Sequence, residues 1–409
     1  IMPSLVGSEM CIRDSYPIGY VRWTENRNMQ SFIDLLSHNR LDIACLISHT
    51  IKFEDSLEAY DMILSKNEKF SGIILQYDKD QKPKRTISNS EKIYDSDNVN
   101  LGLVGAGSFA QAYLLPHLKD KVNFIGIATG SGNTAKYVGD KYKFEYLTDN
   151  ADDIIEDEKI NTILIATRNH LHAPYILKSF SNYKNVFVEK PMAINKKQLD
   201  ELHSLYYKSN FQKQLMIGFN RRFAPSITKM ISELPIDQKM SIIIRVNNTE
   251  IPLAHWTNDP DEGGGRIISD ACHFIDLSMF LAKSDITSVS AESIQDVDNL
   301  NNTVVVNLKF QNGSVASINY FSNGNKNLSK EYIEVYCDGT VAILDDFKTL
   351  TLYGKKKNKI KYKTQDKGHN NCLNAFIDSI RKGDSTPMTF KEIYLSSLAT
   401  LKINESIIE

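Results

Sequence analysis

The sequence predicts an α/β domain built on a parallel sheet, followed by an α+β domain built on a large, mainly antiparallel sheet. Residues 99–222 alternate short apolar, strand-like runs with helical runs, which is typical of a parallel sheet covered by helices on both faces. From about 238, strands follow one another quickly, with turn signals at Asn312-Gly313 and Asp338-Gly339. The length of 409 residues leaves room for two or three domains.

Composition excludes several classes of protein. The chain is 42% hydrophobic and 24% charged, which is ordinary globular material. A net charge of −2 gives no reason to expect nucleic acid or a membrane surface as a partner, and no apolar run approaches the roughly 18 residues of a membrane span. The five cysteines form no CxxC pair, which argues against a zinc site or a disulfide framework and fits a reducing cytoplasm.

The first fifteen residues are expected to lie outside any fold. The segment LVGSEMCIRDS resembles the in-frame translation of a transposase-type sequencing adapter, in which GAG ATG TGT ATA AGA GAC encodes Glu9 to Asp14. We therefore interpret residues 1–15 as an artefact of the sequence, the alternative being an unusual natural N-terminus, and exclude them from the fold.

Residues 16–80 form a separate block. Residues 24–38 place their apolar side chains on one helical face, 54–66 predict a second helix, and 41–48 and 71–78 predict strands. This block is too short to bury a good core alone. Residues 81–98 are polar and without periodicity, so we interpret them as a linker.

The two main domains are predicted over residues 99–222 and 223–409. The first has strand-like runs at 101–107, 123–129, 160–167, 185–190 and 214–219, and helical runs at 109–118, 133–142, 172–180 and 195–209. The second has strands at 242–248, 286–293, 303–310, 314–322, 332–339, 340–346 and 349–354, and closes with helices at 370–382 and 390–406.

A glycine motif opens the first domain. Gly105, Gly107 and Ala110 form a GxGxxA pattern, with Ser108 and Phe109 inside it, between a strand and a helix. Gly105 permits a tight turn, Gly107 lets the backbone approach a pyrophosphate, and Ala110 allows close helix–strand packing. Because a helix N-terminus also presents free N–H groups to phosphates, the motif predicts a dinucleotide site, the alternative being a purely structural turn.

The end of the second strand bears on the choice of cofactor. Thr129 stands where an acid normally binds the adenosine ribose, and the hydroxyls of Thr129 and Ser131, with Lys136 further on, are suited to a 2′-phosphate. No arginine is placed to clamp one. The pattern therefore favours NADP slightly over NAD and leaves both open.

Polar residues follow the third strand. In a doubly wound sheet, ligands lie outside the carboxyl ends of the strands, so Thr167, Arg168, Asn169 and His172 are predicted near the cofactor. For His172, helix capping or core packing is the alternative interpretation.

The fourth strand ends in Glu189, Lys190 and Pro191, and we predict that Glu189 and Lys190 lie at the cofactor. A charged lysine is costly to bury, so Lys190 is expected either in a surface turn or in a polar site. At the mouth of a nicotinamide site it would hydrogen-bond a substrate oxygen and stabilise developing negative charge. Pro191 would fix the backbone that aims the lysine, with a cis bond as one option.

A glycine turn leads into a helix within residues 263–277 (GGGRIISDACHFIDL). His273 lies three or four residues from Ser269 and Asp270 on one side and three from Asp276 on the other, so they share a helix face. A histidine oriented by an acid is a good proton carrier near neutral pH. The alternative is a capping Asp270 beside a core histidine.

These motifs, in this order, resemble those of the Gfo/Idh/MocA family, the glucose–fructose oxidoreductase and inositol dehydrogenase type. The matching segments are GLVGAGSFA, ATRNHLHAPY, VFVEKP, GFNRRF and GGGRIISDACHFIDL. The resemblance implies a Rossmann domain, an open-faced substrate sheet, and hydride exchange between NAD or NADP and a secondary alcohol of a sugar, nucleotide-sugar or cyclitol. It also implies that Lys190 is the catalytic lysine and His273 the proton relay. The usual family acid stands four residues before the histidine, where this chain has Ser269, so Asp270 is a displaced partner.

The finer resemblance is to bi-domain oxidoreductases of surface-polysaccharide gene clusters, in which a zinc-type medium-chain dehydrogenase precedes this module. Residues 16–80 resemble the tail of such a dehydrogenase, so we interpret them as the remnant of an upstream domain missing from this chain.

Five further residues are predicted near the substrate. Asn220, Arg221 and Arg222 follow the last strand of the first domain and are expected at the substrate or the domain interface, the alternative for the arginines being surface ion pairs. His255 and Trp256 would form a pocket wall on which a sugar stacks, the alternative being core packing.

No metal is expected, and the open sheet face predicts a homo-oligomer. Two other functions stay open: NAD-dependent glycoside cleavage on the same fold, and a non-catalytic dinucleotide-binding module.

Overall fold

The computed structural model describes residues 24–77, 86–88, 98–208, 213–235, 237–295 and 300–408. The chain divides into two compact units, residues 1–84 and 85–409. The interpretation of residues 1–15 falls outside the described residues.

The first unit is a small α/β block. Its elements are α2 (Glu25–Ser37), η1 (Ala44–Leu46), β1 (Ile47–Lys52), η2 (Phe53–Asp55), α3 (Ser56–Ser65) and β2 (Gly72–Gln76). The two strands pair in parallel. The predicted strand at 41–48 is wrong in its bounds, because the backbone N–H of Ala44 donates to Asp42 Oδ1 at 2.8 Å and a short helical turn precedes β1.

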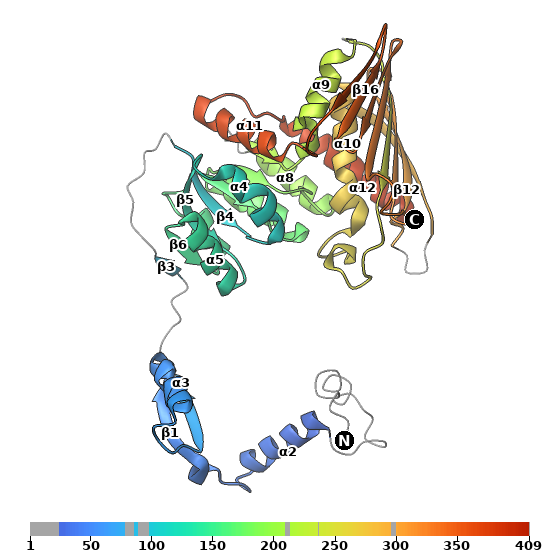
Figure 1. The fold of residues 1–409 in the computed structure, drawn as a ribbon. Coiled ribbons are helices and arrows are strands. Elements are labelled where there is room, and N and C mark those ends of the chain that lie inside the picture. The colour runs from blue at the N-terminus through green and yellow to red at the C-terminus, as the bar shows by residue number, and fades with distance from the viewer. Residues whose placement is uncertain are drawn as a thin grey trace. The chain divides into compact units, whose positions relative to one another are not determined.

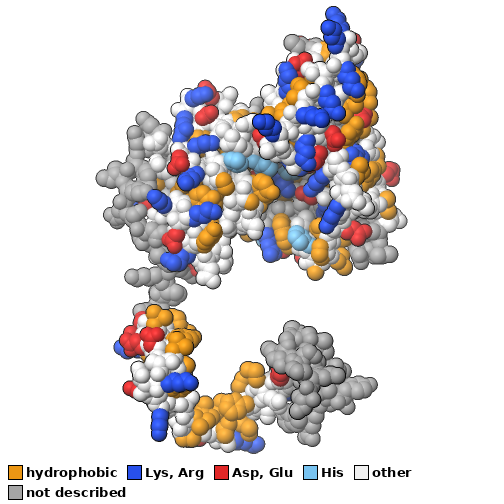
Figure 2. All heavy atoms as spheres, viewed as in Figure 1, with side chains coloured by type: hydrophobic (Ala, Val, Ile, Leu, Met, Phe, Trp, Pro, Cys, Tyr) orange, Lys and Arg blue, Asp and Glu red, His pale blue; other side chains and the backbone are white. Residues whose placement is uncertain are grey.

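Apolar side chains of this unit remain in solvent, as Figure 2 shows along its surface. Leu57 and Leu64 are 77% and 78% exposed, and Ala59 is the only buried apolar residue described in the unit. Further exposed side chains are Met29, Phe32, Ile33, Leu35, Leu46, Phe53, Tyr60 and Tyr77. The prediction that this block is too short to bury a core is confirmed for its described residues.

The second unit begins with a seven-stranded sheet. Its strands are β3 (Thr86–Ser88), β4 (Asn100–Val104), β5 (Asn123–Ala128), β6 (Tyr146–Thr148), β7 (Thr162–Ile165), β8 (Asn185–Val188) and β9 (Leu215–Ile217). They lie in the order β3-β6-β5-β4-β7-β8-β9, and all neighbours are parallel except β3 and β6. From β6 to β9 this is the doubly wound dinucleotide-binding order, so the predicted fold class is confirmed.

Helices cover both faces of this sheet (Figure 1). They are η3 (Ala110–Leu114, a π-helical turn), α4 (Leu115–Leu118), α5 (Gly132–Tyr142), α6 (Ala151–Ile155), η4 (Asn169–Leu171), α7 (His172–Ser181) and α8 (Lys196–Lys208). Every residue of β4, β7 and β8 is buried, as expected of strands between two helical layers. The structure adds β6 and α6, which are too short to show a period, and β3, which lies inside the predicted linker.

The second sheet has eight strands. They are β10 (Ser241–Asn247), β11 (Ile286–Ser293), β12 (Val304–Phe310), β13 (Val315–Phe321), β14 (Glu331–Cys337), β15 (Thr340–Asp345), β16 (Thr349–Tyr353) and β17 (Lys357–Lys361). The order is β11-β12-β13-β10-β14-β15-β16-β17, and only β10 and β13 pair in parallel. The lysine-rich β17 was not predicted. Both turn predictions are confirmed, since Gly313, Asp338 and Gly339 all have positive φ.

One face of this sheet is covered and the other carries exposed apolar residues. The remaining helices are η5 (Asn220–Phe223), α9 (Pro225–Glu233), η6 (Trp256–Asn258), η7 (Ile267–Ala271, a π-helical turn), α10 (Cys272–Ala282), α11 (His369–Lys382) and α12 (Phe390–Ile408). Helices α9, α10 and α12 pack on one face, where alternate strand residues are buried (Figure 1). Ile243, Val305 and Val315 are 38–46% exposed on the other. No described helix is long and apolar enough to cross a membrane.

Two buried ion pairs join η5 to the second domain. Arg221 donates to both carboxylate oxygens of Glu331 at 2.8 Å, and the Glu331 side chain is fully buried. Arg222 binds Asp276, and their side chains are 2% and 1% exposed. The arginines therefore lie at the predicted domain interface and not in surface ion pairs.

Arg222→Met should destabilise the second unit by about 3–5 kcal/mol, because it leaves the buried Asp276 carboxylate without its partner. Denaturant unfolding of the full chain measures this. The matched control is Lys196→Met, which removes an exposed (i, i+4) pair with Asp200 and should leave the free energy of unfolding nearly unchanged. Equal losses in the two variants would contradict the proposed importance of the buried pair.

Candidate functional site

The glycine turn after β4 leaves room for a ligand. Gly105 has φ +91°, and a Cβ there would lie 2.5 Å from the carbonyl oxygen of Ala166, so this position requires glycine. A Cβ on Gly107 would meet nothing within 4 Å, so the backbone here borders open space. The turn and the helix start therefore fit the pyrophosphate of a dinucleotide.

The other residues of the motif divide between packing and exposure. Ala110 is 1% exposed and packs in the core, whereas Ser108 is exposed. The Phe109 ring is 41% exposed and lies 5.9 Å from the ring of His369 on α11. Helix α11 of the second domain thus borders the glycine turn, which the sequence did not predict.

Two of the three residues predicted to bind a 2′-phosphate, Ser131 and Lys136, interact with other residues of α5. Ser131 caps α5, its Oγ accepting from the backbone N–H of Thr134 at 3.5 Å. Lys136 pairs with Asp140 at 3.7 Å on the same helix. Thr129 remains half-buried at the end of β5. The positions of these three side chains therefore do not support the slight preference for NADP over NAD.

The segment after β7 holds the glycine turn of the second domain. Asn169 is buried, and its Nδ2 donates to the carbonyl of Gly263 at 2.8 Å and to Ser269 Oγ at 2.9 Å. Arg168 forms an ion pair with Glu262 and lies over the Trp256 ring, 5.6 Å from its centroid. These two predicted cofactor residues therefore position the segment that precedes η7.

His172 is a packing residue, as its alternative interpretation held. It is 1% exposed, and its Nδ1 and Nε2 lie 2.8 and 3.2 Å from the carbonyl oxygens of Pro191 and Thr167. Burial, against these two hydrogen bonds, lowers the pKa of His172 to about 4, so the ring is neutral and donates through one nitrogen. The ring packs between the end of β7 and Pro191, the residue after Lys190.

Lys190 is turned into the protein. Its side chain is 19% exposed, and its Nζ donates to the carbonyl of Ser269 at 2.5 Å and lies 3.5 Å from Asp270 Oδ1. The surface-turn interpretation is therefore wrong. The Lys190-Pro191 bond is cis, as one of the predicted options held.

Asp270 is the acid beside Lys190. Tyr320 donates to its Oδ2 at 3.0 Å, and Arg266 lies 3.8 Å from the same oxygen. Burial would raise the pKa of Asp270, but the charges of Lys190, Lys330 and Arg266 and the Tyr320 hydrogen bond outweigh it and hold the pKa at about 2.

Tyr320 and Arg266 were not predicted as site residues. Tyr320 falls on the buried side of β13, where the alternating pattern indicates core packing. Arg266 directly follows the glycine turn in the sequence, but no sequence pattern indicated that its side chain would lie near Asp270.

His273 is buried and neutral. It is 7% exposed, and its Nδ1 has no hydrogen-bond partner in the part of the chain that the structure describes. Burial, and then the positive charges of Arg221 and Lys190, lower the pKa of His273 well below its usual value. No carboxylate orients this ring among the described residues, because Asp276 binds Arg222 and Asp270 binds Lys190, so the predicted histidine–acid pair is wrong.

The five predicted substrate residues do not gather at one wall. Arg221 and Arg222 are committed to the buried ion pairs described above, and Asn220 donates to the carbonyl of Lys367 at 2.8 Å. Their predicted contact with the substrate has no support in this geometry. His255 is exposed beside Trp256, with the ring centroids 5.8 Å apart, so these two remain available to a ligand.

Glu189 is buried beside Lys190. It is 7% exposed, and a Cβ on Gly218 would lie 2.7 Å from its Oε1, so its carboxylate is packed against the end of β9. Burial raises the pKa of Glu189 to about 7, against the opposing effects of Lys190 and Arg221. Within the described residues, no group of three or more His, Cys, Asp and Glu is placed to hold a metal ion.

Comparison with known proteins supports this architecture. Residues 99–219 match the family model described as "Oxidoreductase family, NAD-binding Rossmann fold", and residues 234–342 match the GFO/IDH/MocA C-terminal domain. Together the two matches span more than half of the chain. Neither family match includes residues 16–80, so the expected remnant of a zinc-type dehydrogenase stays a prediction.

Similar curated proteins include an uncharacterized oxidoreductase, YrbE, of Bacillus subtilis, which is 26% identical over 53% of this chain and 65% of its own length. Levoglucosan dehydrogenase of Pseudarthrobacter phenanthrenivorans is 27% identical over 45% of this chain and 51% of its own length. The chain thus spans about half to two thirds of the length of these relatives.

Solved structures share the fold. Levoglucosan dehydrogenase in complex with NADH and levoglucosan superposes with a TM-score of 0.66 at 20% identity, covering 76% of this chain and 97% of that one. A dehydrogenase (MviM) from Clostridium difficile gives a TM-score of 0.64 at 22% identity, covering 76% and 100%.

Glu189→Gln should change how stability depends on pH. The unfolded pKa is near 4.5 and the folded pKa about 7, so between these values the folded state binds a proton that the unfolded state lacks. The wild type therefore loses stability relative to the variant as pH rises through this window, by on the order of 3 kcal/mol. Unfolding at pH 4, 6 and 8 measures this, with the exposed Glu201→Gln as control. A constant difference across these pH values would contradict the buried acid.

Proposed function

Because the chain belongs to the Gfo/Idh/MocA family of oxidoreductases, we propose that it transfers a hydride between NAD or NADP and a CH–OH carbon of a sugar, nucleotide-sugar or cyclitol. One observation carries this proposal. Lys190, at the carboxyl end of β8, meets Ser269 and Asp270 of the second domain at the sheet edge where the glycine turn borders open space. A ligand at this edge would therefore touch both domains.

The cofactor would be held by the turn after β4. The positive φ of Gly105 and the open side of Gly107 fit a dinucleotide, and the N-terminal N–H groups of the following helix favour its phosphates. When bound, the nicotinamide would accept or give the hydride. Since Ser131 and Lys136 are engaged within α5, we favour NAD as the partner.

Lys190 would bind the reacting oxygen. Its ammonium lies at the junction of the domains with a carbonyl and a carboxylate on one side, which leaves its remaining donor capacity for a substrate. An ammonium aimed at an alcohol oxygen stabilises the negative charge that develops as hydride leaves the carbon. In the reverse direction it polarises the carbonyl.

Asp270 would hold Lys190 in place. Since its pKa is about 2, Asp270 stays ionised at neutral pH and is too weak a base to remove a proton efficiently. Tyr320 fixes its other oxygen at 3.0 Å. Asp270 and Tyr320 are therefore positioning residues that act through Lys190.

His273 would take the proton of the substrate hydroxyl. A neutral imidazole carries one N–H and one lone pair, and its Nδ1 has no partner among the described residues. The lowered pKa keeps the ring neutral at physiological pH, so one ring nitrogen retains its lone pair.

Residues 16–80 would be the tail of an upstream medium-chain dehydrogenase domain, ahead of domains at 99–222 and 223–409. The exposed Leu57 and Leu64, on a unit that buries almost no apolar side chain, support a missing partner domain. This arrangement, with the free cysteines, fits a cytoplasmic enzyme of surface-polysaccharide metabolism. A longer reading frame that enters an unrelated domain directly upstream would contradict it.

Lys190→Met should lower kcat by on the order of a hundredfold or more, because it removes the donor that stabilises charge on the reacting oxygen. NADH binding, followed by its fluorescence, should persist because the glycine turn is untouched. The assay follows NADH formation with a panel of sugars, cyclitols and nucleotide-sugars.

The control for Lys190→Met is Lys196→Met, which removes an exposed lysine six residues along the chain. Its turnover should match that of the wild type. Undiminished turnover in Lys190→Met would refute the role of Lys190. Absence of saturable NADH and NADPH binding in the folded wild type would refute the proposed activity as a whole.

A further inference from the structure

A pocket lies next to the candidate site, at one end of the second sheet. Its volume is about 520 Å³, within the range of small-molecule sites. Its walls are residues 247–249 at the end of β10, residues 325–330 before β14, and Asp345, Asp346, Lys348 and Thr349 around the turn from β15 to β16. We call it the lysine pocket, after Lys326, Lys330 and Lys348 in these walls.

The wall is held in one arrangement by a buried asparagine. Asn247 is 8% exposed, and its Nδ2 donates to the carbonyls of Asn325 and Leu328 at 2.8 and 2.9 Å. Its Oδ1 accepts from the backbone N–H of Asn325 at 3.1 Å. The segment that carries Lys326 and Lys330 is thus pinned at two points.

The lysine pocket is connected to the candidate active site. Asn248, in its wall, donates from Nδ2 to the Tyr320 hydroxyl at 3.1 Å, and Tyr320 donates to Asp270 at 3.0 Å. Asp270 in turn lies beside Lys190. Lys330 is near enough that its charge lowers the pKa of Asp270. The pocket wall and Lys190 are therefore linked through Asn248, Tyr320 and Asp270.

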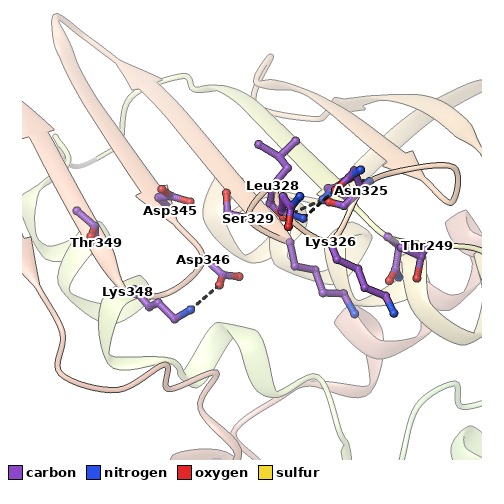
Figure 3. A pocket seen from close by; sticks show the side chains of 13 residues that line it. Thr249, Asn325, Lys326, Leu328, Ser329, Asp345, Asp346, Lys348 and Thr349 are labelled. Carbon is purple, nitrogen blue, oxygen red and sulfur yellow. Dashed lines mark hydrogen bonds and ion pairs between the residues drawn. The ribbon is translucent and has the colours of Figure 1, made fainter.

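The charges in the pocket are unbalanced. Lys348 pairs with Asp346 at 3.1 Å (Figure 3). Lys326 and Lys330 have no carboxylate within 4 Å in the part of the chain that the structure describes. Lys330 is open to the pocket yet surrounded by protein, and this partial burial lowers its pKa, against the opposing charge of Asp270.

The surroundings add positive charge. Glu331, the residue after Lys330, is already neutralised by Arg221 and by Lys367, whose Nζ lies 2.6 Å from its Oε1. The pocket wall thus carries three lysines against two aspartates, Asp345 and Asp346. Because Lys326 and Lys330 have no ion-pair partner among the described residues, their ammonium groups are available to an anion.

We propose that the lysine pocket binds an anionic substituent of the substrate, a phosphate or a carboxylate, while Lys190 binds the reacting oxygen. This inference rests on the proposed function and narrows the substrate class to acidic sugars, that is sugar phosphates, nucleoside-diphosphate sugars or uronic acids. The pocket walls belong entirely to the second domain, whereas the glycine turn for the cofactor phosphates belongs to the first, so the pocket anion is not part of the dinucleotide.

The test is isothermal titration of the full chain, saturated with NADH, with glucose, glucose 1-phosphate, glucuronate and UDP-glucose. An acidic probe should bind at least about tenfold more tightly than glucose, since each charge-assisted hydrogen bond contributes a factor of this order. Which acidic probe binds best identifies the phosphate, carboxylate or diphosphate as the anion. Added salt should weaken this binding.

Substitutions of the pocket lysines test whether the anion binds in the lysine pocket. Lys326→Met and Lys330→Met should each weaken the best acidic probe by about tenfold, and Lys330→Arg should retain most of the affinity. Lys309→Met removes an exposed lysine on the outer face of β12 and should change nothing. Thermal unfolding confirms that each variant is folded.

Two outcomes overturn the proposal: glucose binding as tightly as every acidic probe, or acidic probes binding equally to wild type, Lys326→Met and Lys330→Met. Failure of the proposed function is separate. If NADH does not bind but an acidic probe binds in a Lys330-dependent way, the pocket assignment stands and the dehydrogenase assignment falls.

Discussion

Two consecutive arginines set the geometry on which the rest of the second unit depends. Arg221 and Arg222 leave the last strand of the parallel sheet and enter the second domain, where they meet the buried carboxylates of Glu331 and Asp276. Removing either partner would leave an uncompensated buried charge, so the two domains resist sliding against one another. This constraint brings η7 to the carboxyl end of β8, where neither domain alone could form the site.

The contact between the two domains allows Lys190 to be partly buried while it keeps polar partners. Its ammonium would be costly to bury in one domain, but it is accepted at the junction because Ser269 and Asp270 come from the other. The titratable groups around Lys190 differ in their charge state. The charges of Lys190, Lys330 and Arg266 keep Asp270 ionised. Burial, and then the charges of Arg221 and Lys190, keep His273 neutral. An ammonium held by a carboxylate can stabilise negative charge on an alcohol oxygen, and a neutral imidazole can accept its proton.

Sequence predicted the parts of this site that local pattern encodes. The GxGxxA turn, the lysine at a strand end and the helix histidine follow from strand–turn–helix patterns, and so does the helix-covered parallel sheet of the first domain. The partners of these residues were not predictable, because they depend on contacts between segments far apart in the chain. Asp270 has Lys190 as its partner and not His273, and Tyr320 looks like an ordinary core residue of an alternating strand. Short elements such as β3 gain their pairing from the sheet and show no period of their own.

The most direct measurement is a crystal structure of the full chain with NADH bound. The account predicts the pyrophosphate at Gly105 and Gly107, and the nicotinamide ring beside Lys190 and His273. A substrate whose CH–OH carbon faces the reactive carbon of the nicotinamide ring would then place its oxygen within about 3 Å of the Lys190 ammonium. A nicotinamide ring that lies away from Lys190, with the lysine still bound only to Ser269 and Asp270, would contradict the account.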